Sequence, residues 1–306
     1  MKHFLKYTLA TVTGIIITTI LGIFIVVGIL GAIAGSSDAP VKVKDPSIYE
    51  LELKGQLVDR SEDDPFSGAF AEAMGQTAVI QIGLDEILMN IEKAKNDSLI
   101  KGIYLKGGTL AGGLASVKEI RDALVDFKSH GKFIVAYADN YLQSNYYLAT
   151  VADQILLNPS GMVDFRGIAS EILFLKNTLD KLGVEMQVVK VGTYKSAVEP
   201  YIETKMSDAN REQVTSYTRS MWNSMISEIA AARKLTTEQL NAYADEMMTM
   251  QPVEKYIAYN MVDSLVYADE VDSILTGYLA DYKLLTHKSM NKVVDKTKFS
   301  KDKVAV

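Results

Sequence analysis

One lysine, Lys195, stands among small, apolar and aromatic residues in the stretch VGTYKSAVEP, residues 191–200. Most lysines are solvated surface charges, especially in loops. Packing against apolar side chains would instead remove water from the amine, which disfavours its charged form and lowers its pKa. A neutral amine can act as a general base. The segment therefore allows two interpretations, a surface charge or a catalytic base.

Hydroxyl groups are the remaining candidates for a nucleophile, because the chain contains no cysteine. The candidate serines are Ser116, Ser144, Ser160 and Ser196. Serines in loops mostly form turns and helix caps, so residue type alone assigns none of them to the chemistry.

Two further patterns offer less chemistry. The three histidines, His3, His130 and His287, are scattered and predict neither a histidine-based triad nor a metal cluster. Residues 105–116, LKGGTLAGGLAS, predict a glycine-rich strand-to-helix turn whose backbone N–H groups could bind an oxyanion. Its spacing fits neither a dinucleotide-binding motif nor a Walker motif, so the sequence implies no metal and no organic cofactor.

The composition is that of a globular protein with one sizeable core, since 48% of the 306 residues are hydrophobic. The net charge is −6, and no run of Lys and Arg forms a face on which a phosphate backbone could lie. Both features argue against nucleic acid as a partner.

Strands and helices alternate through the middle of the chain. A strand with a turn at Lys54–Gly55 is expected over residues 49–59, and an acidic stretch follows over residues 60–68. The expected order then continues with helix 84–95, strand 102–105, helix 115–127, strand 133–138, helix 141–152 and strand 154–157. Such alternation predicts an α/β fold of βαβ units around a largely parallel sheet.

The elements before Lys195 predict its position. Residues 170–184 are expected to form a helix that ends at Gly183, and residues 185–192, EMQVVKVG, a buried strand. Lys195 would then follow the carboxyl end of a strand, where α/β folds commonly place functional residues. This position favours the catalytic interpretation.

A long helix is expected after Lys195, over residues 208–233. Its larger apolar side chains recur at helical spacing and predict a core or subunit contact; they are Met221, Trp222, Met225 and Ile229.

Residues 7–35 contain no charge and exceed the ~20 residues that cross a bilayer core as a helix. Lys2, His3 and Lys6 precede this stretch and place the N-terminus in the cytoplasm by the positive-inside rule. A cleaved signal peptide is the alternative, with AIAG at residues 32–35 as a cleavage site. An uncleaved anchor is favoured, because the apolar region of a signal peptide usually spans only ~7–15 residues. The polar residues 36–49 predict a linker.

Several segments together resemble the signal peptide peptidase A family (protease IV, peptidase family S49) of the long type. They are LELKGQLVD, IKGIYLKGGTLAGG, DNYLQSNYYLATVADQILLNPSGMVDFRGI, LDKLGVEMQVVK, VGTYKSAVEPY, KMSDANREQ and YNMVDSL. The resemblance covers residues 51–266, and its lysine segment is highly specific.

This resemblance implies a ClpP/crotonase-like fold of repeated ββα units with a parallel sheet and flanking helices. It also implies peptide cleavage by a serine nucleophile and a lysine general base. Lys195 matches the base, and Tyr194, Ser196 and Glu199 are neighbours that could orient it. Long members carry the base in a first repeat and the serine in a second, and they assemble into tetramers or larger rings.

The departure from the family pattern falls on the nucleophile. The family's serine-glycine-glycine-tyrosine segment aligns with QSNYYLA, which puts Gln143 in the place of the serine. Glutamine cannot attack a carbonyl. Ser144 is one residue away, which on a helix is a rotation of about 100 degrees.

The expected organisation has five parts. They are a cytoplasmic leader (1–6), a transmembrane anchor (7–35), a linker (36–49), a peptidase domain (50–283), and a linker with the start of a truncated second repeat (284–306). The final VAV resembles the opening strand of that repeat, and we expect a longer protein. A frayed natural tail is the alternative.

The expected function is that of a single-pass, membrane-anchored serine endopeptidase on the periplasmic or outer side of a bacterial cytoplasmic membrane. It would degrade cleaved signal peptides and other short hydrophobic peptides. This chain would supply the base, lack the nucleophile and be inactive alone. A non-catalytic scaffold of the same fold is the alternative. A crotonase-like enzyme is a third, disfavoured because acyl-CoA is cytoplasmic.

Overall fold

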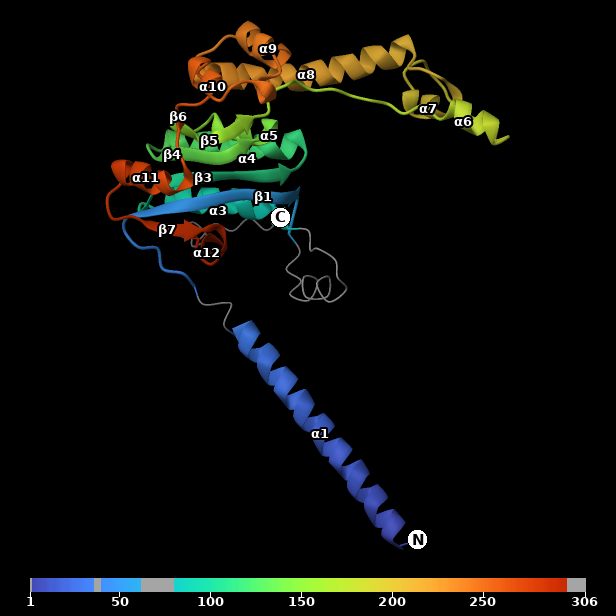
Figure 1. Ribbon diagram of the computed structural model, residues 1–306, viewed down its shortest axis with the longest axis vertical. Helices are drawn as coiled ribbons and strands as arrows, with labels where there is room; N and C mark the ends of the chain where they lie inside the picture. Colours follow the sequence, from blue (N-terminus) through green and yellow to red (C-terminus); the bar gives the residue numbers. More distant parts are fainter. Residues whose placement is uncertain (1, 36–39, 62–79, 296–306) are drawn as a thin grey trace, which may run out of the picture.

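The computed structural model describes residues 2–35, 40–61 and 80–295. Figure 1 shows a long N-terminal helix, an α/β body, and an arm that extends from the body. The strands are β1 (Ser47–Val58), β2 (Gln81–Gly83), β3 (Ile100–Ala111), β4 (Phe133–Tyr141), β5 (Gln154–Val163), β6 (Ser264–Leu265) and β7 (Lys283–Thr286).

The helices differ widely in length. They are α1 (Lys2–Gly35), α3 (Leu84–Asn96), α4 (Leu114–Ser129), α5 (Gln143–Ala149), α6 (Lys176–Lys181), α7 (Glu199–Ile202), α8 (Asp208–Arg233), α9 (Thr237–Asp245), α10 (Glu254–Ala258), α11 (Val271–Tyr278) and α12 (His287–Asn291). Short 3-10 helices are η1 (Ser196–Val198), η2 (Met248–Met250) and η3 (Ala268–Glu270).

Within the described residues, seven strands form one sheet in the order β2-β1-β3-β4-β5-β6, and β7 also pairs with β1. All of these pairings are parallel. Parallel neighbours need a crossover connection, which α3, α4 and α5 provide between successive strands. The predicted α/β fold with a parallel sheet and flanking helices is confirmed.

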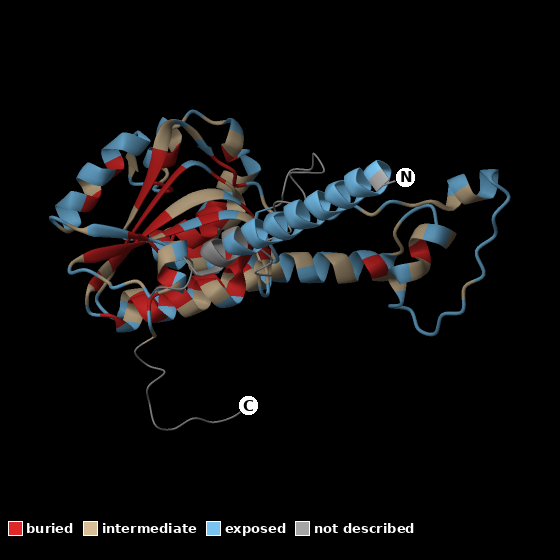
Figure 2. Cartoon of the chain, turned by 90° about the horizontal axis from the view of Figure 1, so that it is seen from below, coloured by how far each residue is buried: buried red, intermediate tan, exposed pale blue. Residues whose placement is uncertain are grey.

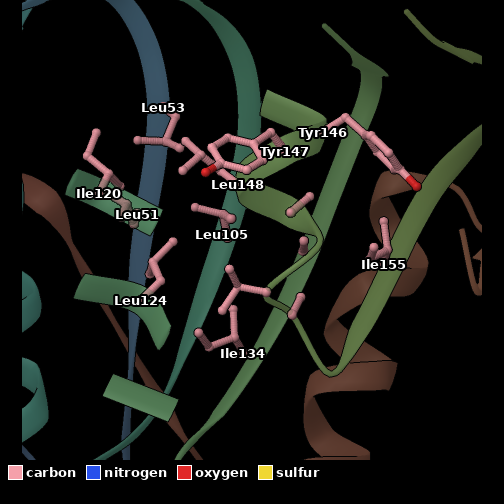
Figure 3. Close-up of a cluster of buried hydrophobic side chains, with 14 of the residues drawn as sticks. Leu51, Leu53, Leu105, Ile120, Leu124, Ile134, Tyr146, Tyr147, Leu148 and Ile155 are labelled. Atoms are coloured by element: carbon pink, nitrogen blue, oxygen red, sulfur yellow. The ribbon is translucent and has the colours of Figure 1, made fainter. Parts of the chain in front are cut away.

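Alternate residues of the central strands form the main core. Leu51 and Leu53 of β1, Leu105 of β3 and Ile134 of β4 point to one face of the sheet, where they meet helices α4 and α5 (Figure 3). Helix α4 buries Val117, Ile120, Leu124 and Phe127, three or four residues apart, so one stripe of the helix faces the sheet. A smaller apolar cluster on the opposite face packs against α11.

Three predicted helices, 84–95, 115–127 and 208–233, correspond to α3, α4 and α8. The strands are longer than expected. No turn interrupts β1 at Lys54–Gly55. Instead the register against β3 shifts there, and Gly55 has φ +103°, a conformation that favours glycine. Likewise β3 continues through Gly107 to Ala111, which leaves only Gly112 and Gly113 as the turn before α4.

Two predictions before Lys195 were wrong. The helix expected over residues 170–184 is limited to α6, although Gly183 does follow it with φ +71°. Residues 185–192 belong to no strand and are almost wholly exposed, with Val189 100% and Val191 85% accessible. Lys195 therefore does not follow a buried strand.

The ends of the body also differ from the expected boundaries. Strand β1 begins at Ser47, inside the expected linker. Beyond residue 283, β7 pairs with β1, and Leu285, Met290 and Val293 are buried in the main core, so this part of the expected second linker belongs to the body. The final VAV, and residues 62–68 of the acidic stretch, lie outside the described residues.

Helix α1 has the length and composition to cross a membrane. Its apolar stretch, His3–Gly28, has 26 residues and a mean hydropathy of 2.5. At 1.5 Å per residue, such a helix exceeds the ~30 Å of a bilayer core. Figure 2 shows residues 3–28 of this helix exposed, in contrast to the buried interior of the body.

Candidate active site

Lys195 lies on what we call the lysine arm, residues 168–207, which extends from the end of β5 to the start of α8. Figure 1 shows α6 and α7 at the far end of this arm, away from α5 and the sheet, and Figure 2 shows the same extension from below. The Lys195 side chain is exposed and makes no hydrogen bond or ion pair with the described part of the chain. The described residues therefore do not provide the expected desolvation of its amine.

The residues on either side of Lys195 are fastened to α8. The Tyr194 hydroxyl donates to Glu212 Oε2 at 3.1 Å, and the Ser196 hydroxyl donates to Gln213 Oε1 at 3.4 Å. Neither neighbour contacts the amine through these bonds. They hold the backbone that carries Lys195 against the first turns of α8.

Glu199 provides a stronger anchor one helical turn after Lys195. Its side chain is buried, with 2% of the residue accessible. The Ser207 hydroxyl donates to Glu199 Oε1 at 2.6 Å, and the Asn210 side-chain amide donates to Oε2 at 2.9 Å. Burial opposes ionisation, but these hydrogen bonds outweigh it and lower the pKa of Glu199. Because Ser207 is also the N-cap of α8, the carboxylate ties the lysine segment to the beginning of that helix.

Gln143 is the first residue of α5, two residues after the end of β4, at the carboxyl edge of the sheet. Its Oε1 accepts hydrogen bonds from the backbone N–H groups of Arg166 and Gly167, each at 3.1 Å, and its Nε2 donates to Gly167 O at 3.1 Å. Both ends of the amide are thus occupied by the backbone that follows β5. The position that the family pattern gives to the nucleophile carries no hydroxyl.

The candidate serines are spread over the molecule. Ser116 lies in the first turn of α4, Ser144 in that of α5, Ser160 in β5, and Ser196 beside Lys195. Within the described residues, none of the four hydroxyls hydrogen-bonds to a lysine or a histidine, so the chain shows no assembled nucleophile and base.

The glycines of β3 allow close packing at this edge of the sheet. A Cβ on Gly107 would come within 2.7 Å of Ala138 Cβ. The buried Asn145, in the first turn of α5, donates its side-chain amide to Gly108 O. The sequence did not predict that Asn145 is buried, because nothing in QSNYYLA distinguishes a buried asparagine from one on the surface of a helix.

An open groove of about 690 Å³ lies beside the end of β3. Its lining includes Lys54, Gly55 and Leu57 of β1, Thr109 of β3, and Gly112 and Gly113 before α4. The glycine-rich segment singled out in the sequence therefore borders a groove at the carboxyl edge of the sheet.

The family model and several curated relatives that match most of the chain belong to peptidases. The sequence profile of peptidase family S49 matches residues 126–277. Protease 4 of Haemophilus influenzae is 33% identical over 220 residues, which are 71% of this chain and 36% of that protein. Protease 4 of Salmonella typhi is 34% identical over 236 residues, with 74% and 38% covered. The chloroplastic serine protease SPPA of Arabidopsis thaliana is 27% identical over 248 residues, with 80% and 34% covered.

Among solved structures, a membrane-bound stomatin-specific protease is 13% identical with a TM-score of 0.41, covering 80% of this chain and 94% of that one. The chain spans little more than a third of the length of the three curated relatives. The matched profile runs from α4 to α11 and includes α5, the lysine arm and α8, and the chain belongs to peptidase family S49.

Proposed function

We propose that this chain is the base-supplying part of a membrane-anchored serine endopeptidase whose nucleophilic serine lies in a second repeat of the complete protein. The observation that carries the proposal is the presentation of Lys195. Its amine is exposed and without a partner in the described residues, whereas the segment around it is fastened to α8 through Tyr194, Ser196 and Glu199. A fixed backbone and an exposed side chain are suited to a lysine whose active site is completed by another protein unit.

In this proposal two proton transfers form the acyl-enzyme, and water then hydrolyses that ester, with Lys195 accepting the proton of water and returning it to the serine oxygen. The serine oxygen of the second repeat attacks the carbonyl carbon of the scissile peptide bond while the neutral Lys195 amine accepts its proton. The amine then returns that proton to the leaving nitrogen as the C–N bond breaks. Docking of the second repeat on the lysine arm would remove water from the amine and so favour its neutral form.

Gln143 and the length of the relatives support this division of labour. The Gln143 amide is occupied by backbone hydrogen bonds and offers no nucleophile. The chain covers 36% and 38% of the two bacterial proteases named Protease 4, which leaves ample length in such proteins for a second repeat.

The substrate and location follow from the family resemblance and from α1. We propose short, unfolded hydrophobic peptides, such as cleaved signal peptides, as the substrate. Helix α1 would anchor the protein, with Lys2 and Lys6 on the cytoplasmic side and the body on the outer side of a bacterial cytoplasmic membrane. The assembled enzyme would be a homo-oligomer such as a tetramer.

The test compares the 306-residue chain with the complete protein on a fluorogenic hydrophobic peptide. We expect hydrolysis by the complete protein only, and a loss of at least ~100-fold in kcat on Lys195→Ala. Lys205→Ala, which removes another exposed lysine of the arm, is the matched control and should keep full activity. Hydrolysis by the 306-residue chain that disappears on Lys195→Ala would refute the division of labour.

A non-catalytic scaffold is the second candidate, and the occupied amide of Gln143 is the observation that favours it. The same assay separates the two functions. A scaffold predicts a folded, assembled complete protein without Lys195-dependent hydrolysis.

A further inference from the structure

The root of the lysine arm is the short segment 164–167, where the chain leaves β5. Asp164 is held by Thr249, whose hydroxyl donates to Asp164 Oδ1 at 3.0 Å, and by an ion pair to Arg166 at 2.8 Å. Phe165 is fully buried. These contacts fix the root up to Arg166, but none of them reaches into the arm.

Among the contacts at the root, the hydrogen bonds of Gln143 lie closest to the lysine arm. Its carboxamide accepts from the N–H groups of Arg166 and Gly167 and donates to the carbonyl of Gly167, all at 3.1 Å. Gly167 has φ +89°, which turns the backbone so that its N–H and carbonyl both face one side chain. A side chain with both an acceptor and a donor is required to satisfy the two groups together.

The first part of the lysine arm, residues 168–174, makes no hydrogen bond to the body among the described residues. Within the described chain, residues 168–174 form no hydrogen bond, and the next one, from Leu175 N to Pro200 O at 2.6 Å, joins two parts of the arm itself. Among the described residues, the Gln143 amide therefore makes the last hydrogen bonds to the body before the segment that carries Lys195.

After the lysine arm, the chain returns to the body through α8, and this helix is also bonded to α5. The Tyr147 hydroxyl of α5 donates to Glu228 Oε2 of α8, and Phe165 at the root packs against Trp222 of α8 with ring centroids 5.3 Å apart. The short helix α5 therefore contacts both ends of the arm. Gln143 bonds to the root before it, and Tyr147 bonds to α8 after it.

We infer that Gln143 is a positioning residue for Lys195, which fixes the direction in which the lysine arm leaves the body. The consequence for catalysis rests on the function proposed above, whereas the positioning itself does not. Serine at this position would be too short to reach both groups of Gly167. Gln143→Ser should therefore loosen the arm, and should not create a self-sufficient peptidase.

Distances between spin labels test the positioning without any activity. The natural chain has no cysteine, so Val125→Cys on α4 and Asn177→Cys on α6 give two unique and exposed labelling sites. We expect a narrow distance distribution in the otherwise natural chain. Gln143→Met keeps the length of the side chain but removes its hydrogen bonds, and should broaden the distribution, as should Gln143→Ser.

Two further variants sharpen the measurement. Gln143→Glu keeps an acceptor for both N–H groups but loses the donor to Gly167 O, so its distribution should lie between those of the natural chain and Gln143→Met. Ser144→Ala, next in the helix, is the matched control and should change nothing. Amide exchange at Arg166 and Gly167 should be about tenfold faster in Gln143→Met. An unchanged distribution and unchanged exchange in Gln143→Met would overturn the inference.

Kinetics of the complete protein add the functional consequence. Gln143→Met should lower kcat about tenfold or more at unchanged KM, because the base is misplaced while the substrate still binds, and Gln143→Glu should restore part of the loss. Full kcat in a Gln143→Met protein with a broadened distribution would overturn the role in positioning Lys195. Absence of hydrolysis in every variant, including the unmodified protein, would count against the proposed function. The distance measurement would then still test whether Gln143 positions the lysine arm.

Discussion

Lys195 is placed by its neighbours and not by contacts of its own amine. Tyr194 and Ser196 bond to the first turns of α8, and the buried Glu199 accepts three hydrogen bonds from the N-terminal residues of that helix. A side chain that must enter another unit benefits from this arrangement, since the backbone is ordered before the contact forms and less entropy is lost on binding.

Acidification should release the lysine segment from α8. The pKa of Glu199 lies below its ordinary value of 4.5, so its carboxylate stabilises the folded arm above about pH 4.5, and this contribution is lost as the pH falls through the lowered pKa. Amide exchange of residues 196–210, measured from pH 5 downward, should show the loss.

Glu199→Gln should weaken the attachment at neutral pH and remove most of its pH dependence. Glu203→Gln, an exposed glutamate of the same arm, is the control and should behave as the natural chain does. Equal pH dependence of the natural chain and Glu199→Gln would show that another group controls the release.

The sequence predicts Lys195 as the base and places no hydroxyl at position 143, because both statements depend only on residue type within a motif. It could not indicate that Lys195 is exposed, nor that Gln143 bonds to Arg166 and Gly167. Those contacts depend on where the chain leaves β5, more than twenty residues from Gln143, and no local pattern records them.

At the scale of elements, α8 links the arm to the body through a partly buried charged cluster. Arg121 of α4 is 4% accessible, and its Nε lies 3.0 Å from Glu228 Oε2 of α8. Lys118 and Tyr147 also bond to this carboxylate. Burial opposes ionisation of Glu228, but the hydrogen bonds and the two cations outweigh it and lower its pKa.

Glu228→Ala should therefore reduce the free energy of unfolding by about 3 kcal/mol, because it leaves the buried Arg121 guanidinium without its anion. Urea denaturation of the body measures this loss, with Glu119→Ala on the exposed side of α4 as control. A change of less than about 0.5 kcal/mol, as for ordinary surface substitutions, would mean that the cluster does not hold α8.

The docking of α12 should depend on pH through His287. The Tyr49 hydroxyl hydrogen-bonds to His287 Nδ1 at 2.7 Å, and Asn90, Glu86 and Lys93 of α3 surround the ring. Burial lowers the pKa of His287 below 6.5, although Glu86 acts in the opposite direction. The folded state therefore resists protonation, and its stability is present above about pH 6.5 and falls on acidification.

Thermal denaturation at pH 7 and pH 5 checks this expectation. The natural chain should lose stability between the two values, and His287→Gln, which keeps an acceptor for Tyr49, should lose less. His130→Gln alters an exposed histidine and should match the natural chain. Identical losses in all three proteins would contradict a role for His287.

The helices α3, α4 and α8 could be predicted because each buries apolar residues at helical spacing within this chain. The strand expected over residues 185–192 could not, although EMQVVKVG has strong strand propensity. A strand requires a partner for its backbone groups, and the described chain provides none beside the exposed Val189 and Val191. Propensity indicated the kind of structure, but not whether its partner belongs to the same chain.

The whole molecule consists of a long apolar helix, an α/β body with a buried core, and an exposed arm that projects from the body (Figure 1). The body buries its core within itself, whereas the arm leaves Leu173, Leu182 and Val189 exposed. Several large apolar side chains exposed on one segment are typical of a surface that contacts another protein unit. This arrangement agrees with a site that is completed from outside the chain.

Labelling of the complete protein with a serine-directed fluorophosphonate, followed by mass spectrometry, tests the central claim most directly. We predict that the reagent modifies one serine outside these 306 residues, and that Lys195→Ala slows the modification by at least ~100-fold. Modification of Ser144 or another serine of this chain, or an unchanged rate in Lys195→Ala, would contradict the account.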